Sequence, residues 1–583
     1  MSEQRKQQRT FYCGLLRPEH EGREVTLFGW VQRQRDIGHL LFIDLRDREG
    51  IAQVVFSTGK PELLEAAKKL RPEYVVIVSG VVRRRDPKAV NREMATGEVE
   101  VEAGELEILN ISKVPPFQIT DPVQAAEDLR MKYRYIDLRR PSKQRTIRLR
   151  HEAALRTRNY LSDRGFLEIE TPFLTKSTPE GARDYLVPSR IYKGRFYALP
   201  QSPQIFKQTL MISGFDRYFQ IVRCFRDEDL RSERQPEFTQ IDIEMSFVDR
   251  EDVFSLVDGM LAAIFEIIGE KVETPLPRLT FPESMEKYGT DKPDLRIKAE
   301  ITDLTAEASD SRSEVIRKVL DAGGMLRGLK VPGAAGLSRS RLDKIGQKAQ
   351  ELGARGVIWI KKQDGFRSSL KLEAAEASLI WEKMQARDED LVLLVADRRE
   401  IALSALGHFR KELLQAESGK GFAFAWVTDF PLFEWSEEEK KIVSVHHPFT
   451  SPFAEDIPLL GSEPMRVRAR AYDVVCNGYE IGGGSVRIHD FALQRKIFDL
   501  LGLSEKETEE KFGYFLEALG YGTPPHGGIA MGFDRIVMLL AGEESIREVI
   551  PFPKTTSALC LLTGSPSEVG ERQLDELGLK LKK

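Results

Sequence analysis

The chain of 583 residues has no apolar run that approaches the roughly 18 residues needed to cross a bilayer, and its polar N-terminus carries no apolar segment like that of a signal peptide. Its cysteines are few and scattered, without a Cys-x-x-Cys pair or a Cys/His cluster at zinc spacing. They are Cys13, Cys224, Cys476 and Cys560. These absences predict a cytoplasmic, reducing location in which the thiols are buried and unbridged.

The sequence also lacks an excess of charge of either sign. Its 87 Lys and Arg residues stand against 91 Asp and Glu residues, a formal net charge of −4. A nucleic-acid partner would therefore have to meet local basic patches, because no global positive field exists. The length requires several cores, since one domain per roughly 150 residues suggests about four units.

Short β-prone runs separated by glycines and charged turns fill residues 26–110, and one helix-prone segment at 61–70 interrupts them. Five or so strands with one helix predict a small Greek-key barrel of the oligonucleotide-binding type over residues 1–110. Basic residues at 33–35 and 83–85, with Phe42 and Phe56 close in sequence, suit stacking on unpaired bases beside a phosphate track. A solvated barrel with core phenylalanines is the alternative that these residues leave open.

Proline-rich sequence predicts a hinge over residues 111–140. A helical pattern at 144–164 then leads into a strand that ends at Pro172, and the Gly/Pro/Ser/Thr-rich loop at 175–185 has the composition of a mobile lid. The remaining boundaries follow from changes in composition. They give a part at 141–286, an inserted α+β domain without any chemical constellation at 287–420, a further part at 421–553 and a C-terminal extension at 554–583.

The densest chemistry lies between residues 219 and 245, where an apolar run, a charged turn and an alternating run predict two antiparallel strands. Alternate residues of a strand share a face, so polar side chains of both strands can project into one cleft. These side chains are Arg226, Glu228, Gln240, Asp242 and Glu244. Taken alone, the segment would be explained better by an arginine paired with a carboxylate on a solvated hairpin, which accounts for most such loops.

Two other segments carry polar groups with a defined spacing. Gln204 and Lys207 lie three residues apart at the start of a predicted helix, so both face the same way. The adjacent His446 and His447 lack further metal ligands at the right spacing, which favours hydrogen bonding to an anionic substrate over metal binding.

Glycine-rich segments near the C-terminus combine carboxylates with arginines. Asp473 and Glu480 precede three glycines that allow a close backbone approach to a ligand, and Arg487 follows them. A second glycine-rich strand opens onto a helix whose early turn carries Arg535. A triphosphate between arginines, with Mg²⁺ held by carboxylates, is the chemistry that this set suits.

Three of these segments resemble the motifs of class II aminoacyl-tRNA synthetases, in the same order. Motif 1 ends at Pro172, motif 2 is Phe225-Arg-Asp-Glu228, and motif 3 runs from Gly527 to Arg535. Together with residues 200–204, 231–238, 446–450 and 482–489, they make nearly the whole chain similar to the bacterial-type aspartyl-tRNA synthetases. Phe533 departs from this family, which usually has Leu before the Asp-Arg pair.

The resemblance implies a multidomain α/β and β fold. An N-terminal OB-type β-barrel would read the anticodon, and a class II catalytic domain would be an antiparallel sheet with helices, split by the inserted domain. It also implies a homodimer formed through motif 1.

The resemblance further implies residue roles. The ATP contacts would be Arg226, Asp227, Glu228, Gln235, Glu480, Gly532, Phe533, Asp534 and Arg535. The L-aspartate contacts would be Glu180, Ser202, Gln204, Lys207, Arg226, Gln240, Asp242, His446, His447 and Arg487. The anticodon contacts would be Arg35, Ile37, Phe42, Gln53, Glu98 and Glu100. Mg²⁺ would be held by Asp473 and Glu480, which form the catalytic set with Arg226 and Arg535.

The implied activity is that of an aspartate–tRNA ligase, which activates L-aspartate with ATP and transfers it to the 3′-terminal ribose of tRNA-Asp. An inactive paralogue that only binds nucleic acid would have lost a motif arginine or a Mg²⁺ carboxylate, and all are present. A lysine enzyme would need an acidic pocket, whereas Lys207 and Arg487 predict a cationic one that asparagine would leave unpaired. Charging of both tRNA-Asp and tRNA-Asn stays open.

Overall fold

The computed structural model describes residues 8–177, 181–362, 364–414 and 421–582. The chain divides into two compact units. The first runs to Arg148 and includes Pro551–Thr555 and Leu559–Ser567, and the second comprises the remaining residues. The domain boundaries expected from the sequence stay predictions. No helix among the described residues is long and apolar enough to span a membrane.

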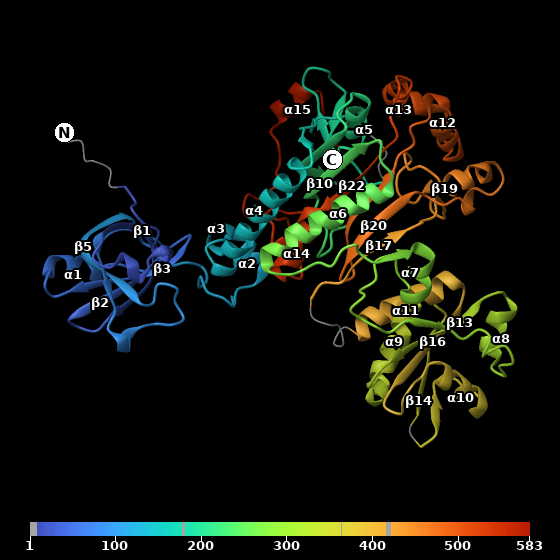
Figure 1. The fold of residues 1–583 in the computed structure, drawn as a ribbon, viewed down its shortest axis with the longest axis horizontal. Coiled ribbons are helices and arrows are strands. Elements are labelled where there is room, and N and C mark those ends of the chain that lie inside the picture. Colours follow the sequence, from blue (N-terminus) through green and yellow to red (C-terminus); the bar gives the residue numbers. More distant parts are fainter. Residues whose placement is uncertain (1–7, 178–180, 363, 415–420, 583) are drawn as a thin grey trace. The chain divides into compact units, whose positions relative to one another are not determined.

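The first unit is built around a closed five-stranded barrel with the strand order β1-β2-β3-β5-β4 (Figure 1). Its elements are β1 (Glu24–Asp36), β2 (Leu40–Asp47), β3 (Gly50–Ser57), α1 (Pro61–Lys68), β4 (Val75–Arg84) and β5 (Val99–Asn110). Alternation decides the faces, because Leu41, Ile43 and Leu45 of β2 enter the core while Phe42 and Asp44 between them do not. The predicted barrel with five strands and one helix is confirmed.

Short helices follow the barrel in the same unit: α2 (Glu127–Lys132), α3 (Arg134–Asp137) and the first turns of α4 (Pro141–Ser162). The expected helix at 144–164 therefore begins three residues earlier and ends two residues earlier. Asp121 accepts hydrogen bonds from the backbone N–H of Ser142 and from Arg140, which satisfies the start of α4.

An eight-stranded sheet forms the centre of the second unit, in the order β11-β17-β20-β21-β22-β10-β9-β6. Pairing is antiparallel except at its two edges, where β11 and β6 run parallel to their neighbours. The strands are β6 (Leu167–Glu168), β9 (Arg217–Phe225), β10 (Glu237–Ser246), β11 (Arg278–Thr280), β17 (Phe424–Thr428), β20 (Ala471–Cys476), β21 (Tyr479–Val486) and β22 (His526–Gly532). The predicted class II antiparallel sheet is confirmed.

One face of this sheet is covered by an apolar helical layer, and the other carries polar side chains. Ile241, Ile243 and Met245 of β10 pack in one core with α6 (Arg250–Phe265) and α14 (Phe533–Ala541). The alternate residues of β10 point to the opposite face. Other helices of this part of the chain are α5 (Gln204–Ile212), α7 (Phe281–Tyr288), α12 (Phe491–Leu500), α13 (Glu505–Leu519) and α15 (Glu571–Leu577).

Between α7 and β17 lies a separate five-stranded sheet in the order β12-β13-β16-β14-β15. Helices cover both of its faces, because alternate residues of β16 (Leu391–Asp397) enter two different cores. Its other elements are β12 (Ile301–Asp303), α8 (Glu314–Asp321), β13 (Met325–Val331), α9 (Arg339–Glu351), β14 (Ile358–Lys362), β15 (Phe366–Ser368), α10 (Ala374–Lys383) and α11 (Arg399–Leu413). Two small hairpins complete the fold: β7 (Leu186–Pro188) with β8 (Phe196–Ala198), and β18 (Phe433–Ser436) with β19 (Lys441–Ser444).

Asp258 on α6 joins the helical layer to the sheet. Its carboxylate accepts hydrogen bonds from Trp426 Nε1 at 2.8 Å and from the backbone N–H of Leu276 at 3.0 Å. Trp426 and Leu276 are buried, so neither donor could turn to water if the carboxylate were removed.

We expect Asp258→Ala to lower the free energy of unfolding by about 2–5 kcal/mol, because two buried donors lose their acceptor and each costs roughly 1–3 kcal/mol. Urea denaturation followed by tryptophan fluorescence measures the change. Glu270→Ala, an exposed site just beyond the same helix, is the matched control and should change stability by less than about 0.5 kcal/mol. Equal stability of the two variants would contradict the role of Asp258.

Candidate active site

The polar face of the large sheet carries a row of side chains on β10, beside the glycine-rich strand β22. Gln240, Asp242 and Glu244 pair in register with Gly532, Ala530 and Gly528 of β22. A Cβ at Gly528 would lie 2.1 Å from Glu244 Oε2, so only glycine leaves room for that carboxylate.

One end of this face opens into a cavity of about 180 Å³. The predicted residues that line it are Arg226, Glu228, Gln235, Gln240, Glu480, Gly532, Asp534 and Arg535. Arg226 lies over the Phe238 ring at 5.2 Å, and Arg535 Nη1 donates to the Glu480 carbonyl oxygen at 2.6 Å. The cavity thus gathers two arginines that have been fixed by an aromatic ring and a backbone carbonyl, an arrangement suited to phosphate groups.

Three residues expected to contact ATP serve the framework in this structure. The Asp534 carboxylate accepts from the Thr239 backbone N–H at 2.7 Å and pairs with Arg150 at 2.6 Å. Phe533 is buried in the core below, and Asp227 forms a backbone bridge with Arg183 without lining the cavity. The unusual Phe533 therefore packs under the strand.

Farther along β10, four charged side chains form a buried cluster, which we call the ion cluster: Lys207, Arg487, Asp242 and Glu244. Lys207 Nζ lies 2.7 Å from Asp242 and 3.2 Å from Glu244, and Arg487 Nε lies 3.0 Å from Glu244. Two cations face two carboxylates, so the cluster is formally neutral. The expectation of a cationic pocket is wrong in this respect, because the β10 carboxylates compensate both cations.

Burial and pairing oppose each other in this cluster. Burial raises the pKa of Asp242. Burial also acts to raise the pKa of Glu244, but Arg487 and then Lys207 outweigh it and hold that pKa below its ordinary value. For Arg487, burial disfavours the charge, yet Glu244 leaves its pKa raised. The guanidinium and the Glu244 carboxylate therefore stay charged.

Two histidines beside the cluster have pKa values that are shifted in opposite directions. Burial, with Arg487 nearby, lowers the pKa of His447 to about 3, so its ring is neutral. His446 is also buried, but the Asp473 carboxylate 3.5 Å from its Nε2 outweighs that effect and raises its pKa.

Several buried polar atoms of this region have no hydrogen-bond partner among the described residues. They are Gln204 Nε2, Gln208 Nε2, Asp242 Oδ2, His446 Nδ1 and His447 Nε2. Buried polar groups are rarely left unpaired in a folded protein, so this concentration marks the place of a polar ligand. Four of these five residues were predicted to contact the amino acid, whereas Gln208, whose Oε1 lies 3.0 Å from His526 Nε2, was not.

Asp473 and Glu480 lie on β20 and β21 on either side of Gly483. A Cβ at Gly483 would meet Asp473 Oδ1 at 2.7 Å and Glu480 Oε1 at 3.7 Å, so both carboxylates reach the space above this glycine. The described residues contain no group of three or more ligands for a metal. Two carboxylates nevertheless fit Mg²⁺, which commonly keeps one or two protein ligands beside phosphate oxygens and water.

Two other residues predicted to contact the amino acid are not part of the ion cluster. Ser202 lines a neighbouring cavity with Gln201 and Asp184. Gln201 donates to Asp184 at 2.6 Å and fixes the chain around Ala182 through its side-chain amide. Glu180 lies outside the described residues.

On the barrel, four predicted anticodon residues form one connected cluster. Arg35 donates to Gln53 Oε1 and Gln53 Nε2 donates to Glu100, both at 2.8 Å, and Arg35 lies 5.7 Å from the Phe42 ring. Ile37 is 55% exposed at the tip of the β1–β2 hairpin, and the Glu98 side chain is exposed. Phe42 thus presents a ring beside hydrogen-bonding groups, as base recognition requires.

Sequence reasoning left some site residues unassigned. Glu233, Arg234, Phe238 and Thr239 also line the cavity that Arg226 and Arg535 share, and Arg234 pairs with Glu228 at 3.0 Å. Glu244 was placed on the correct face but received no role. Its position two residues after Asp242 indicated the shared face. Its role depends on Lys207 and Arg487, which lie far away in sequence.

Comparison with known proteins agrees with this geometry. Residues 126–556 match the family model described as tRNA synthetases class II (D, K and N), and residues 25–109 match the OB-fold nucleic acid binding domain. The chain is 52% identical over 582 residues to an aspartate–tRNA(Asp/Asn) ligase of Caldanaerobacter subterraneus, with 98% of each chain covered. It is 51% identical to an aspartate–tRNA ligase of Clostridium perfringens, with 98% of this chain and 97% of that protein covered.

Solved structures share the fold. An asparaginyl-tRNA synthetase from Pyrococcus horikoshii, complexed with asparaginyl-adenylate, aligns with a TM-score of 0.60 at 20% identity. The alignment covers 94% of this chain and 99% of that one.

We expect Lys207→Met to lower the free energy of unfolding by about 3–5 kcal/mol, because it leaves Asp242 and Glu244 buried with one cation between them. Thermal and urea denaturation measure this change. Adding Asp242→Leu should recover part of the loss, since the uncompensated carboxylate disappears. Lys287→Met, at an exposed position of α7, is the control; a Lys207→Met protein as stable as this control would refute the structural role of the ion cluster.

Proposed function

Because the chain belongs to the class II tRNA synthetases of the aspartate, lysine and asparagine group and is an aspartate–tRNA ligase, we propose that the polar face of β10 carries out both steps of the ligation. In the first step L-aspartate and ATP form aspartyl-adenylate, and in the second the aspartyl group passes to the 3′-terminal ribose of tRNA-Asp. The concentration of unpaired buried polar atoms beside the ion cluster is the observation that supports this assignment.

The spacing of the two sites along β10 suits an in-line attack. Gln240 lines the nucleotide cavity, and Asp242 begins the ion cluster one same-face position farther along. Two residues of a strand span about 6.6 Å, so an amino acid held at the ion cluster adjoins the cavity that Gln240 and Arg226 line. The attack then needs no protein nucleophile, because positioning and charge stabilisation suffice.

Each side chain has a task in this proposal. Arg226 neutralises the charge that builds on the α-phosphate, Arg535 holds the distal phosphates, and Glu228 faces the base. Asp473 and Glu480 would hold Mg²⁺, which when bound shields the phosphates and stabilises the departing pyrophosphate. His446 keeps Asp473 oriented through the contact at 3.5 Å.

The neutral ion cluster offers a physical basis for choosing aspartate. The unpaired Asp242 Oδ2 can accept from the α-ammonium, and Lys207 with Arg487 can donate to the side-chain carboxylate. Once the α-carboxylate has become an anhydride, the aspartyl group carries one positive and one negative charge, which a neutral site accommodates. An asparaginyl group would bring an unbalanced ammonium and leave buried donors unpaired.

The barrel cluster of Arg35, Phe42, Gln53 and Glu100 supports recognition of anticodon bases. Discrimination is a separate question, because the similar proteins include ligases named for tRNA-Asp alone and for tRNA(Asp/Asn). We favour the enzyme that prefers tRNA-Asp, since Ile37 presents an aliphatic side chain at the exposed hairpin tip. A homodimer through motif 1 and a cytoplasmic location stay predictions.

We expect Arg226→Ala to reduce aspartate-dependent ATP–pyrophosphate exchange about 100- to 1000-fold with little change in stability, because one charge-stabilising donor is lost from the transition state. The exchange assay, run without tRNA at equal folded fraction, measures the loss. Arg190→Ala, at an exposed arginine outside the cavity, is the control. Exchange by Arg226→Ala within threefold of wild type would rule out the proposed contact.

We expect a preference for tRNA-Asp over tRNA-Asn of roughly ten- to a hundredfold in kcat/KM, because an aliphatic side chain leaves a mismatched polar base edge unpaired at about 1–3 kcal/mol. Ile37→His should narrow this gap by supplying a polar partner. Charging of both unmodified transcripts measures it, and Ile37→Leu controls for altered packing. Equal kcat/KM for the two tRNAs would instead favour the enzyme that charges both.

A further inference from the structure

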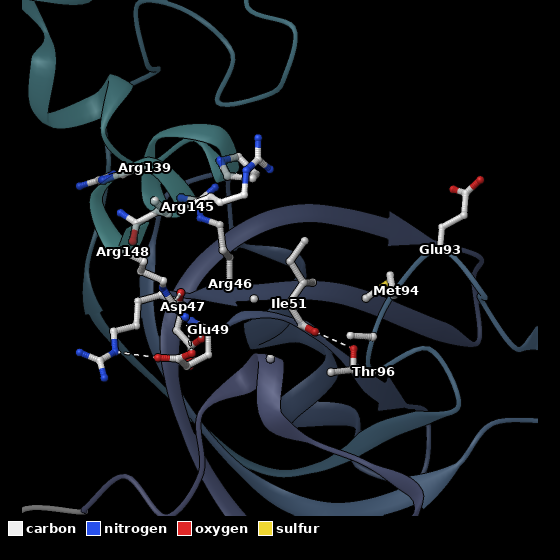
Figure 2. A pocket seen from close by; sticks show the side chains of 16 residues that line it. Arg46, Asp47, Glu49, Ile51, Glu93, Met94, Thr96, Arg139, Arg145 and Arg148 are labelled. Atoms are coloured by element: carbon white, nitrogen blue, oxygen red, sulfur yellow. Dashed lines mark hydrogen bonds and ion pairs between the residues drawn. The ribbon is translucent and has the colours of Figure 1, made fainter. Parts of the chain in front are cut away.

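A further cavity, of about 430 Å³, lies within the first unit and outside the sites described so far. Three segments line it: the turn between β2 and β3, the loop before β5, and the chain from Arg139 into the first turns of α4. Figure 2 shows Arg139, Arg145 and Arg148 gathered beside Arg46, with Ile51 and Thr96 along the floor. Its volume is in the range of ligand sites.

Arg46 is the buried donor of this cavity. It is 6% exposed, and its Nη2 lies 2.8 Å from both oxygens of Glu73. Its Nη1 is also buried but has no hydrogen-bond partner among the described residues. Arg139 donates to the same Glu73 at 2.8 Å, so one carboxylate serves two guanidinium groups. An unpaired donor on a buried cation indicates a missing acceptor.

The remaining arginines are also incompletely compensated. Arg148 and Arg48 share Glu49, at 2.7 and 2.9 Å. Arg145 is exposed and makes no hydrogen bond or ion pair within the described part of the chain. Two carboxylates thus serve four arginines, and the fifth has none.

Other acidic groups reduce this excess without removing it. The Asp47 carboxylate is turned toward the backbone N–H groups of Cys13 and Glu49, at 2.6 and 2.9 Å. Glu93 lines the far end of the cavity. Asp47, Glu49, Glu73 and Glu93 together supply four carboxylates near five guanidinium groups. The positive side of the cavity is the one formed by Arg46, Arg139 and Arg145.

Strand register places this cavity next to the anticodon cluster. Phe42, Asp44 and Arg46 share the outer face of β2, and they pair with Val55, Gln53 and Ile51 of β3. Arg46 therefore follows Asp44, the partner of Gln53, by one same-face position, or about 6.6 Å. Nucleic acid whose bases meet Phe42 and Gln53 would continue along the same face.

We propose that this cavity binds a backbone phosphate of the tRNA strand that leads away from the anticodon bases. The inference rests on the proposed tRNA-ligase function and adds a subsite to it. Guanidinium groups match phosphate oxygens with paired donors, and such contacts strengthen and orient binding without reading sequence. A free oligophosphate has the same chemistry, but the continuity with the anticodon face favours RNA.

The test uses the full chain with Arg145→Gln, which removes the unpaired cation at an exposed position. The dissociation constant for the tRNA-Asp transcript, measured over a range of salt concentrations, should give a log–log slope smaller by about 1. Affinity for tRNA-Asn should fall by the same factor, because a phosphate contact carries no sequence information. Arg23→Gln, at an exposed arginine of the same unit outside the cavity, should keep the wild-type slope.

Aspartate-dependent pyrophosphate exchange without tRNA should be unchanged in Arg145→Gln, which separates this inference from the proposed function. Absent exchange in the wild type would overturn the function itself. A wild-type salt slope in both Arg145→Gln and the Arg48→Gln/Arg145→Gln protein would overturn the phosphate subsite. The subsite would also be overturned if Arg145→Gln weakened the binding of inorganic tripolyphosphate but left the affinity for tRNA unchanged. The cavity would then serve a free oligophosphate.

Discussion

The second unit depends on compensating two carboxylates on one buried face of β10. Asp242 and Glu244 are neighbours on that face and neither is exposed to solvent, so their charges would repel each other without nearby cations. Lys207 from α5 and Arg487 from the chain after β21 supply those cations. Helix α5, strand β10 and the end of β21 are thereby fixed relative to one another by electrostatics as well as by packing. Since burial of unpaired charge is costly, this arrangement permits few alternatives.

Glycines make the close packing around this cluster possible. At Gly528 the Glu244 carboxylate occupies the space of a side chain, and at Gly484 a Cβ would lie 2.1 Å from the Gly528 carbonyl oxygen. Strands β21 and β22 therefore approach each other and β10 more closely than side chains would allow. The same absence of side chains above Gly483 leaves room for Asp473 and Glu480. Backbone, and not side-chain bulk, thus forms the floor of the site.

Buried polar groups differ in how completely they are hydrogen-bonded. In the framework, both oxygens of the Asp258 carboxylate accept hydrogen bonds, whereas Gln204, Asp242 and His447 at the candidate site keep buried atoms unpaired. On the barrel, Arg35 is held by Gln53 and Phe42, while Arg46 keeps an unpaired nitrogen. Unpaired buried polar atoms thus gather beside the ion cluster, although Glu376 and Trp381 of α10 also keep some.

The sequence by itself determined the elements and their order, because period-2 alternation and glycine or proline punctuation are local signals. The barrel strands, the β9–β10 pair and the face shared by Gln240 and Asp242 followed from them. Only the tertiary structure decided the charge balance: that Lys207 and Arg487 are neutralised by β10, that Asp534 faces Arg150, and that Arg46 and Arg145 line one cavity. These contacts join residues up to some hundreds of positions apart. Local pattern fixes which way a side chain points, but its partner depends on how distant strands and helices pack.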